Sequence, residues 1–383
     1  MITSVAQYIL SMKNFDRMAR TLGNRRIYAI PVEGDSEQVR CSIGNSVIVF
    51  EVMCEGEHKA MRVYMRPHHN LRAIYGEHYF AKELLVSSGD DNFGLADVVL
   101  CDWHEGHSLQ AEIERVCAKP VAMAALSRLF EHFAMQLLDE RWAHGDLKPE
   151  NIIISDDGLH LIDFDAMYRE GFSSDDCIEI GTRQFQHPLR DKSHFGRYID
   201  DYPIALITTA LAALAADKSL GHKIMECDYL LIRPELAVKG EDEMLHHIET
   251  LFARQGDARH YRIARLLRSP HPSLPSLRGL LDAKPLHTEH PESLTLEYYG
   301  GLWGFAVDGR FIIPPLYDLA FEFSEGLALV RVGEEWHFID MEGNIAISCG
   351  AGTGIKPFRN GSTRISRVDG EYAIFRDGRI EKI

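Results

Sequence analysis

Residues 144–165 read HGDLKPENIIISDDGLHLIDFD. Asn151 follows Asp146 by five positions, and Asp163 follows Asn151 by twelve. Between Asn151 and Asp163, two short apolar runs flank the turn sequence at 156–158, which predicts a β-hairpin. Such a hairpin would return Asp163 to the side of Asn151. A carboxylate and an amide oxygen, both ligands that Mg²⁺ prefers, would then lie near a second carboxylate that can act as a base. Phosphoryl transfer requires this set of groups.

The same stretch resembles the catalytic region of eukaryotic-type Ser/Thr protein kinases. HGDLKPEN is similar to the family's H-R-D-L-x-x-x-N loop, and DFD at 163–165 is similar to its metal-binding D-F-G. The resemblance implies that Asp146 is the base that orients an acceptor hydroxyl and that Lys148 neutralises the γ-phosphate. It also implies ATP and Mg²⁺ as cofactors, with Asn151 and Asp163 as the metal ligands.

Length and composition narrow the class of protein. A chain of 383 residues is longer than a typical domain, so we expect two domains. The net charge of −16 argues against nucleic-acid and anionic-membrane partners. No apolar run reaches the roughly 18 residues of a membrane span. The seven cysteines form no C-x-x-C pair, and the N-terminus lacks a secretory pattern, so we expect a cytoplasmic protein with reduced thiols.

The first lobe implied by the resemblance covers residues 27–102. Residues 1–26 predict an amphipathic helix that packs on this lobe. The alternation of apolar residues that follows predicts strands. The resemblance places Gly44 in a phosphate-covering loop and Arg62 at the position of the family's ATP-binding lysine. Strand alternation puts Arg62 and Lys59 on opposite faces, so Arg62 is expected to face the phosphates.

Residues 71–87 predict a helix that would present a glutamate to the cation of Arg62. Glu77 and Glu83 are both candidates, and Glu77 is the one favoured.

The second lobe implied by the resemblance covers residues 103–268. At its start, the backbone carbonyl of Asp102 and the amide of His104 would hydrogen-bond adenine. Apolar periodicity predicts two buried helices, at 121–142 and 204–215.

The sequence GTRQFQHP at 181–188 resembles the end of a kinase activation segment. By this resemblance Thr182 would hydrogen-bond Asp146 and Lys148, which is a Ser/Thr-kinase arrangement. Asp200 would anchor the backbone of the catalytic loop rather than act in the chemistry.

A Pro-rich linker is expected at 269–293, followed by a repeat array at 294–383. Trp303, Trp336 and Tyr372 are spaced 33 and 36 residues apart, each before a glycine turn. The array resembles WG repeats, which a bacterial group of kinase-like proteins carries at its C-terminus. Short β-hairpins of this kind bury their aromatics only by stacking on neighbours. The array is therefore expected to lean on the kinase-like domain or on another chain.

Three functions are consistent with these features. The first is an α+β, bilobal kinase-like phosphotransferase with a small all-β array, in which Asp146 serves transfer to an unknown protein substrate. The second is a pseudokinase that binds nucleotide or acts as a scaffold presenting the repeats to a protein partner. It follows from Arg62 in place of lysine and from Asp165 in place of the glycine of D-F-G. The third is a small-molecule kinase of the aminoglycoside or choline type.

Overall fold

The structure is a computed structural model that describes residues 4–89, 92–224, 229–284 and 294–383. It contains two compact units. The first unit comprises Met1–His107 and Ile153–Glu179, and the second comprises Ser108–Ile152 and Ile180–Ile383. Helices and sheets both contribute, so the fold is mixed α+β, and its C-terminal region is all β. The predicted lobes differ from the units because residues 153–179 belong with the first unit.

An antiparallel six-stranded sheet forms the body of the first unit. Its strand order is β1-β5-β6-β8-β7, with β4 also paired to β5. In β5 every second side chain is buried, as expected for a strand with one face on the core. The strands are β1 (Ile27–Ala29), β4 (Cys41–Ile43), β5 (Val47–Cys54), β6 (Glu57–Tyr64), β7 (Tyr79–Gly89) and β8 (Asn92–Asp102), beside a separate hairpin of β2 (Pro31–Val32) and β3 (Asp35–Val39).

The predicted N-terminal helix is present and packs on this sheet. It is divided into α1 (Val5–Lys13) and α2 (Phe15–Met18), followed by the 3₁₀ turn η1 (Leu22–Asn24). Met12 and Phe15 are buried in one apolar cluster with Phe50 and Val52 of the sheet. The first unit therefore includes the N-terminal segment as part of its core.

The predicted helix at 71–87 is wrong beyond its first turn. Only α3 (Leu71–Tyr75) is helical, followed by the 3₁₀ turn η2 (Gly76–His78), and β7 begins at Tyr79. Gly76 has φ 57° and ψ −120°, a conformation that other residues rarely adopt, and it ends the helix. Beyond it, pairing with β8 overrides the helical pattern.

The predicted hairpin after Asn151 is confirmed. It consists of β10 (Ile152–Ser155) and β11 (Gly158–Leu161), joined by a tight turn. The remaining short elements of the chain's central part are β9 (His107–Ser108), η3 (Pro149–Asn151), η4 (Phe164–Ala166), η5 (Ser174–Asp176), η6 (Arg183–Phe185) and η7 (Lys192–His194).

Helices form the first part of the second unit, and α6 lies at its centre. Fourteen of the 16 residues of α6 are buried, which confirms the expected buried helix, as α5 confirms the helix at 121–142. The helices are α4 (Leu109–Val116), α5 (Pro120–Asp139), α6 (Asp201–Ala216), α7 (Gly221–Ile224), α8 (Pro234–Lys239), α9 (Glu243–Gln255), α10 (Ala258–Leu266) and α11 (Leu277–Asp282), with η8 (Lys218–Leu220) before α7.

Among the described residues, no single helix is long and apolar enough to cross a membrane. One bent pair, α6 with the segment Lys218–Ile224, passes that test by length and composition only.

The predicted linker at 269–293 is only partly a linker. It contains α11, which buries Leu277 and Leu281 against α5 and α10 because a four-residue spacing puts both leucines on one helix face. Residues 285–293 lie outside the described part of the chain.

Three successive antiparallel sheets make up the C-terminal region. They correspond to the predicted repeats, and Trp303, Trp336 and Tyr372 stand on β13, β17 and β20. Glu325-Gly326 and Asn360-Gly361 have paired positive φ angles of 54° and 81°, and of 55° and 77°, which suit tight turns. The strands are β12 (Thr295–Tyr299), β13 (Leu302–Val307), β14 (Arg310–Tyr317), β15 (Leu319–Ala320), β16 (Ala328–Val332), β17 (Glu335–Ile339), β18 (Ile345–Ala351), β19 (Ser362–Arg367), β20 (Gly370–Phe375) and β21 (Ile380–Lys382).

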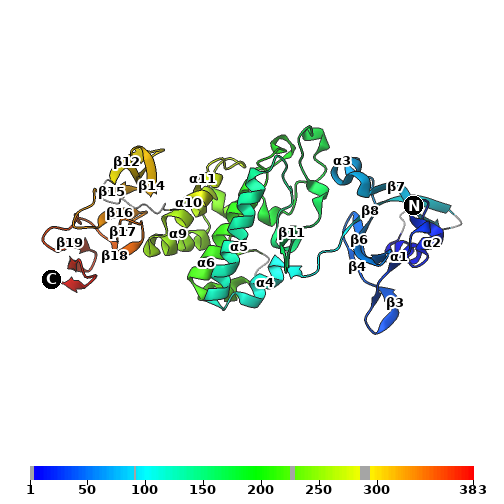
Figure 1. The fold of residues 1–383 in the computed structure, drawn as a ribbon, viewed down its shortest axis with the longest axis horizontal. Helices are drawn as coiled ribbons and strands as arrows, with labels where there is room; N and C mark the ends of the chain where they lie inside the picture. The colour runs from blue at the N-terminus through cyan, green and yellow to red at the C-terminus, as the bar shows by residue number, and fades with distance from the viewer. Residues whose placement is uncertain (1–3, 90–91, 225–228, 285–293) are drawn as a thin grey trace. The chain divides into compact units, whose positions relative to one another are not determined.

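This β region docks on α9 and α10 within the second unit (Figure 1). The buried His337 contacts the Ala253 carbonyl through Nε2 at 2.7 Å, and the Ser348 hydroxyl donates to the Arg254 carbonyl at 3.2 Å. Both carbonyls belong to the last turn of α9, whose carbonyls have no amide four residues ahead within the helix, and the Gly256 amide that follows the helix also donates to the Ala253 carbonyl. The Arg262 side chain also donates to the Leu316 carbonyl at 3.0 Å. The repeats thus lean on the helical part of the second unit, which is one of the two alternatives that the sequence left open.

Candidate functional site

The loop between α5 and β10 brings Asp146, Lys148 and Thr182 together. The Thr182 amide donates to Asp146 Oδ1 at 2.5 Å, and Lys148 Nζ donates to the Thr182 hydroxyl at 2.9 Å. Lys148 Nζ also lies 3.5 Å from Asp146 Oδ2. Both Asp146 oxygens are therefore fixed in direction. These are the contacts that the sequence resemblance led us to expect for Thr182.

Asn151 completes this group through its side-chain amide. Its Nδ2 donates to the Asp146 carbonyl at 2.9 Å and lies 3.3 Å from Asp146 Oδ2. Because the nitrogen is committed to Asp146, the Oδ1 atom of Asn151 is the end of the amide that remains for a cation.

Asp200 holds this loop through hydrogen bonds to its backbone amides. Its carboxylate is buried and accepts hydrogen bonds from the His144 amide and, at 2.9 Å, from the Gly145 amide. The structure therefore gives Asp200 the anchoring position that the sequence suggests.

Arg190 is a second anchor, which the sequence does not indicate. Its guanidinium is buried and donates to the Gly145 carbonyl at 2.9 Å and to the Gln186 side chain. Arg190 thus links the loop at Gly145 to the segment that contains Gln186.

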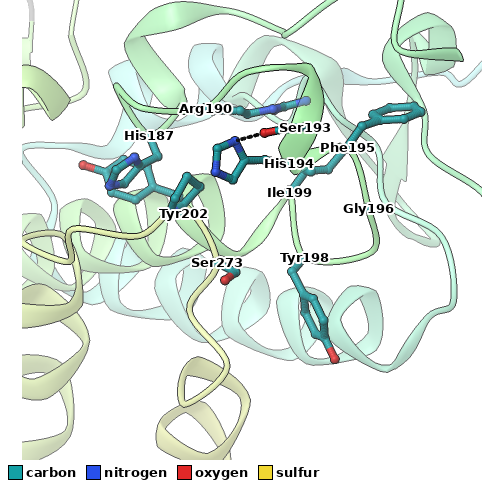
Figure 2. A pocket seen from close by; sticks show the side chains of 11 residues that line it. His187, Arg190, Ser193, His194, Phe195, Gly196, Tyr198, Ile199, Tyr202 and Ser273 are labelled. Carbon is teal, nitrogen blue, oxygen red and sulfur yellow. Dashed lines mark hydrogen bonds between the residues drawn. The ribbon is translucent and has the colours of Figure 1, made fainter. Parts of the chain in front are cut away.

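Arg190 and His187 also line a pocket of about 270 Å³ in the second unit (Figure 2). The ring of Tyr202 lies 5.0 Å from that of His187 in an edge-on contact. Burial lowers the pKa of His187, whose Nε2 lies 3.0 Å from the Ser269 carbonyl. The segment after Thr182 is therefore held in place by contacts inside the second unit.

In the first unit, Arg62 forms the centre of a buried polar cluster. Its Nη2 lies 2.6 Å from Asp163 Oδ1 and 2.6 Å from Asp165 Oδ2, and its Nε donates to the Tyr64 hydroxyl at 3.2 Å. The Tyr64 and Tyr75 hydroxyls donate to Asp165 Oδ1 at 2.7 and 2.8 Å. Burial acts to raise the pKa of Asp165, but the Arg62 charge and the two hydroxyls outweigh it and hold that pKa below its ordinary value.

The expected glutamate partner of Arg62 is absent from this cluster. Glu83 is buried elsewhere, where it accepts hydrogen bonds from the Thr21 amide at 2.7 Å and the Leu22 amide at 2.6 Å. Glu77 lies in the exposed turn η2, in place of the expected long helix. The carboxylates that hold Arg62 are Asp163 and Asp165.

The other nucleotide-site candidates lie at strand ends. The Gly44 amide donates to the Val47 carbonyl at 2.9 Å and closes the turn between β4 and β5. Asp102 ends β8, and its carboxylate accepts from Lys59 Nζ at 2.7 Å. The His104 ring stacks on His160, with ring centroids 4.3 Å apart. Lys59 and Arg62 thus have different partners, as strand alternation predicts.

Asp163 is better suited than Asp165 to act as a metal ligand. Its side chain is 40% exposed and has one contact with Arg62, whereas Asp165 is 11% exposed and uses both oxygens. Asp163 also has a left-handed backbone conformation with φ 68°, which is uncommon outside glycine and is often retained at functional sites. Among the described residues, no group of three or more His, Cys, Asp or Glu side chains is arranged to hold a metal ion.

Sequence reasoning missed the contributions of Tyr64, Tyr75 and Arg190. Tyr64 had a readable signal, since it follows Arg62 by two positions in the same strand and must share its face. Tyr75 gave none, because its position depends on where α3 ends.

Comparison with protein families finds one match. The family of WG-containing repeats matches residues 307–336, which run from the end of β13 into β17. A comparison with the curated proteins found no match to the chain. The C-terminal β region is therefore similar to WG repeats.

Proposed function

We propose that the chain is an ATP- and Mg²⁺-dependent phosphotransferase with a bilobal kinase-like fold, which acts on a protein hydroxyl. The observation that carries the proposal is the convergence of Lys148, Asn151 and Thr182 on Asp146. A solvated aspartate needs no such set of donors, whereas a base that must point at one hydroxyl does.

The roles of the residues follow from these contacts. Asp146 would accept the proton of the acceptor hydroxyl, while the Thr182 amide holds its carboxylate in direction. Lys148 would offset negative charge that develops during transfer. Asn151 and Asp163 each offer an oxygen of the kind that Mg²⁺ prefers as a ligand. Mg²⁺-ATP, when bound, would supply the γ-phosphoryl group.

The test is transfer from γ-labelled ATP to casein, to histone and to the chain itself. Asp146→Asn should reduce transfer by roughly 10²- to 10⁴-fold, because it removes a positioned base. The matched control is Asp156→Asn, an exposed carboxylate in the turn of the neighbouring hairpin, which should transfer like the wild type. Equal transfer by Asp146→Asn and wild type would refute the proposal. Transfer only to an aminoglycoside or to choline would favour a small-molecule kinase.

A second candidate is a pseudokinase that binds nucleotide or presents the repeats. The observation that favours it is the 2.6 Å contact of Arg62 with Asp163, because a carboxylate engaged by a guanidinium is a weaker metal ligand. Binding of a fluorescent ATP analogue without transfer to any acceptor would support this candidate over the first.

A further inference from the structure

The two carboxylates around Arg62 are not equivalent. Each lies 2.6 Å from Arg62 Nη2. Asp165, however, also accepts both tyrosine hydroxyls on its other oxygen, and its backbone carbonyl lies 3.0 Å from His68 Nε2. Asp163 has no second side-chain contact of this kind among the described residues, and its side chain is 40% exposed. Asp165 is thus fixed by its surroundings, while Asp163 is free to turn.

Arg62 itself cannot leave the cluster at low cost. Its side chain is 7% exposed, and a buried guanidinium without a counter-ion is strongly disfavoured. If Asp163 turns toward a metal ion, Arg62 needs another carboxylate. Glu83 is hydrogen-bonded to the N-terminal segment, and Glu77 lies in an exposed turn. Asp165 is therefore the carboxylate positioned to remain the counter-ion of Arg62.

We infer that Asp165 is a positioning residue, the permanent counter-ion that holds Arg62 while Asp163 exchanges from Arg62 to a metal ion. The inference rests on the proposed function. Arg62 and Asp165 then form an ion pair that takes the place of the expected lysine–glutamate pair. Arg62 stands at the position of the lysine, while Asp165 stands at the glycine of D-F-G and takes the role expected of the helix glutamate. Tyr64 and Tyr75 keep the Asp165 carboxylate facing Arg62.

The first experiment compares the stability of three variants of the full chain by thermal unfolding. Asp165→Asn should lower the melting temperature by about 5–10 °C, because it leaves Arg62 with one exposed carboxylate. The matched control is Asp163→Asn, which removes the other contact of the same length and should have the smaller effect. Arg62→Met combined with Asp165→Asn should recover most of the loss. An equal or larger effect of Asp163→Asn, or no recovery in the double variant, would overturn the inference.

The second experiment measures transfer as a function of Mg²⁺ concentration. With Asp165→Asn, Arg62 competes with the metal for Asp163, so the Mg²⁺ concentration for half-maximal transfer should rise about tenfold. The rate at saturating Mg²⁺ should stay within about threefold. A reduced rate with an unchanged Mg²⁺ requirement would contradict the exchange of Asp163. If no variant transfers phosphate, the proposed function fails, while the stability comparison still decides whether Asp165 is the principal counter-ion.

Discussion

Removing the Asp200 carboxylate should loosen the loop at residues 143–147 without altering Asp146 itself. Asp200 accepts from the His144 and Gly145 amides and is 5% exposed. Alanine would deprive both amides of this acceptor in the interior. A buried amide that loses its partner costs about 1–3 kcal/mol, so Asp200→Ala should reduce local stability by about 2–6 kcal/mol. Asp200→Asn keeps one acceptor and should cost about half as much.

Hydrogen–deuterium exchange of the full chain measures this effect at the loop itself. A cost of about 2 kcal/mol corresponds to a roughly 30-fold faster exchange of the loop amides through local opening. The control is Asp377→Ala, an exposed aspartate of the last sheet, which should leave loop exchange unchanged. If Asp200→Ala exchanges within about threefold of the wild type at residues 143–147, the anchoring role is refuted.

Three further predictions concern other buried polar groups. His337→Ala removes the contact with the Ala253 carbonyl and should lower the unfolding free energy by about 2–4 kcal/mol, measured in urea. Burial raises the pKa of Asp201 to about 7, so the folded chain holds a proton that the unfolded chain loses above about pH 4. Stability should therefore fall by about 4 kcal/mol between pH 4 and 7, and Asp201→Asn should flatten this dependence. Glu83→Ala removes the acceptor of the Leu22 amide and should expose the N-terminal segment to limited proteolysis.

Each of these predictions has a control within the chain. His246→Ala removes an exposed histidine of α9 and should not change the urea midpoint. An unchanged pH profile in Asp201→Asn would show that another group causes the dependence. Glu77→Ala removes a glutamate of the exposed turn η2, so equal proteolysis of Glu77→Ala and Glu83→Ala would contradict the role of Glu83.

Local patterns were sufficient where the structure depends on neighbours in sequence. The hairpin after Asn151 follows from a turn sequence between two apolar runs, and the buried helices α5 and α6 follow from their long apolar periodicity. The contacts of Thr182 with Asp146 and Lys148 were expected from the motif, and the structure contains them. The spacing of Trp303, Trp336 and Tyr372 indicated the three sheets.

Contacts between segments that are distant in sequence decided the features that the sequence patterns did not predict. The strand β7 exists because β8 is available beside it, and no periodicity within 71–87 reports that partner. Because this segment forms a strand and not the predicted helix, Glu77 is not a partner of Arg62, and Glu83 lies against Leu22. The sequence alone determined that Asp146, Lys148 and Asn151 stand together on one loop, because motif spacing is local. Only the tertiary structure decided which carboxylate holds Arg62, because a buried charge takes its partner from whatever segments the fold brings within hydrogen-bonding distance.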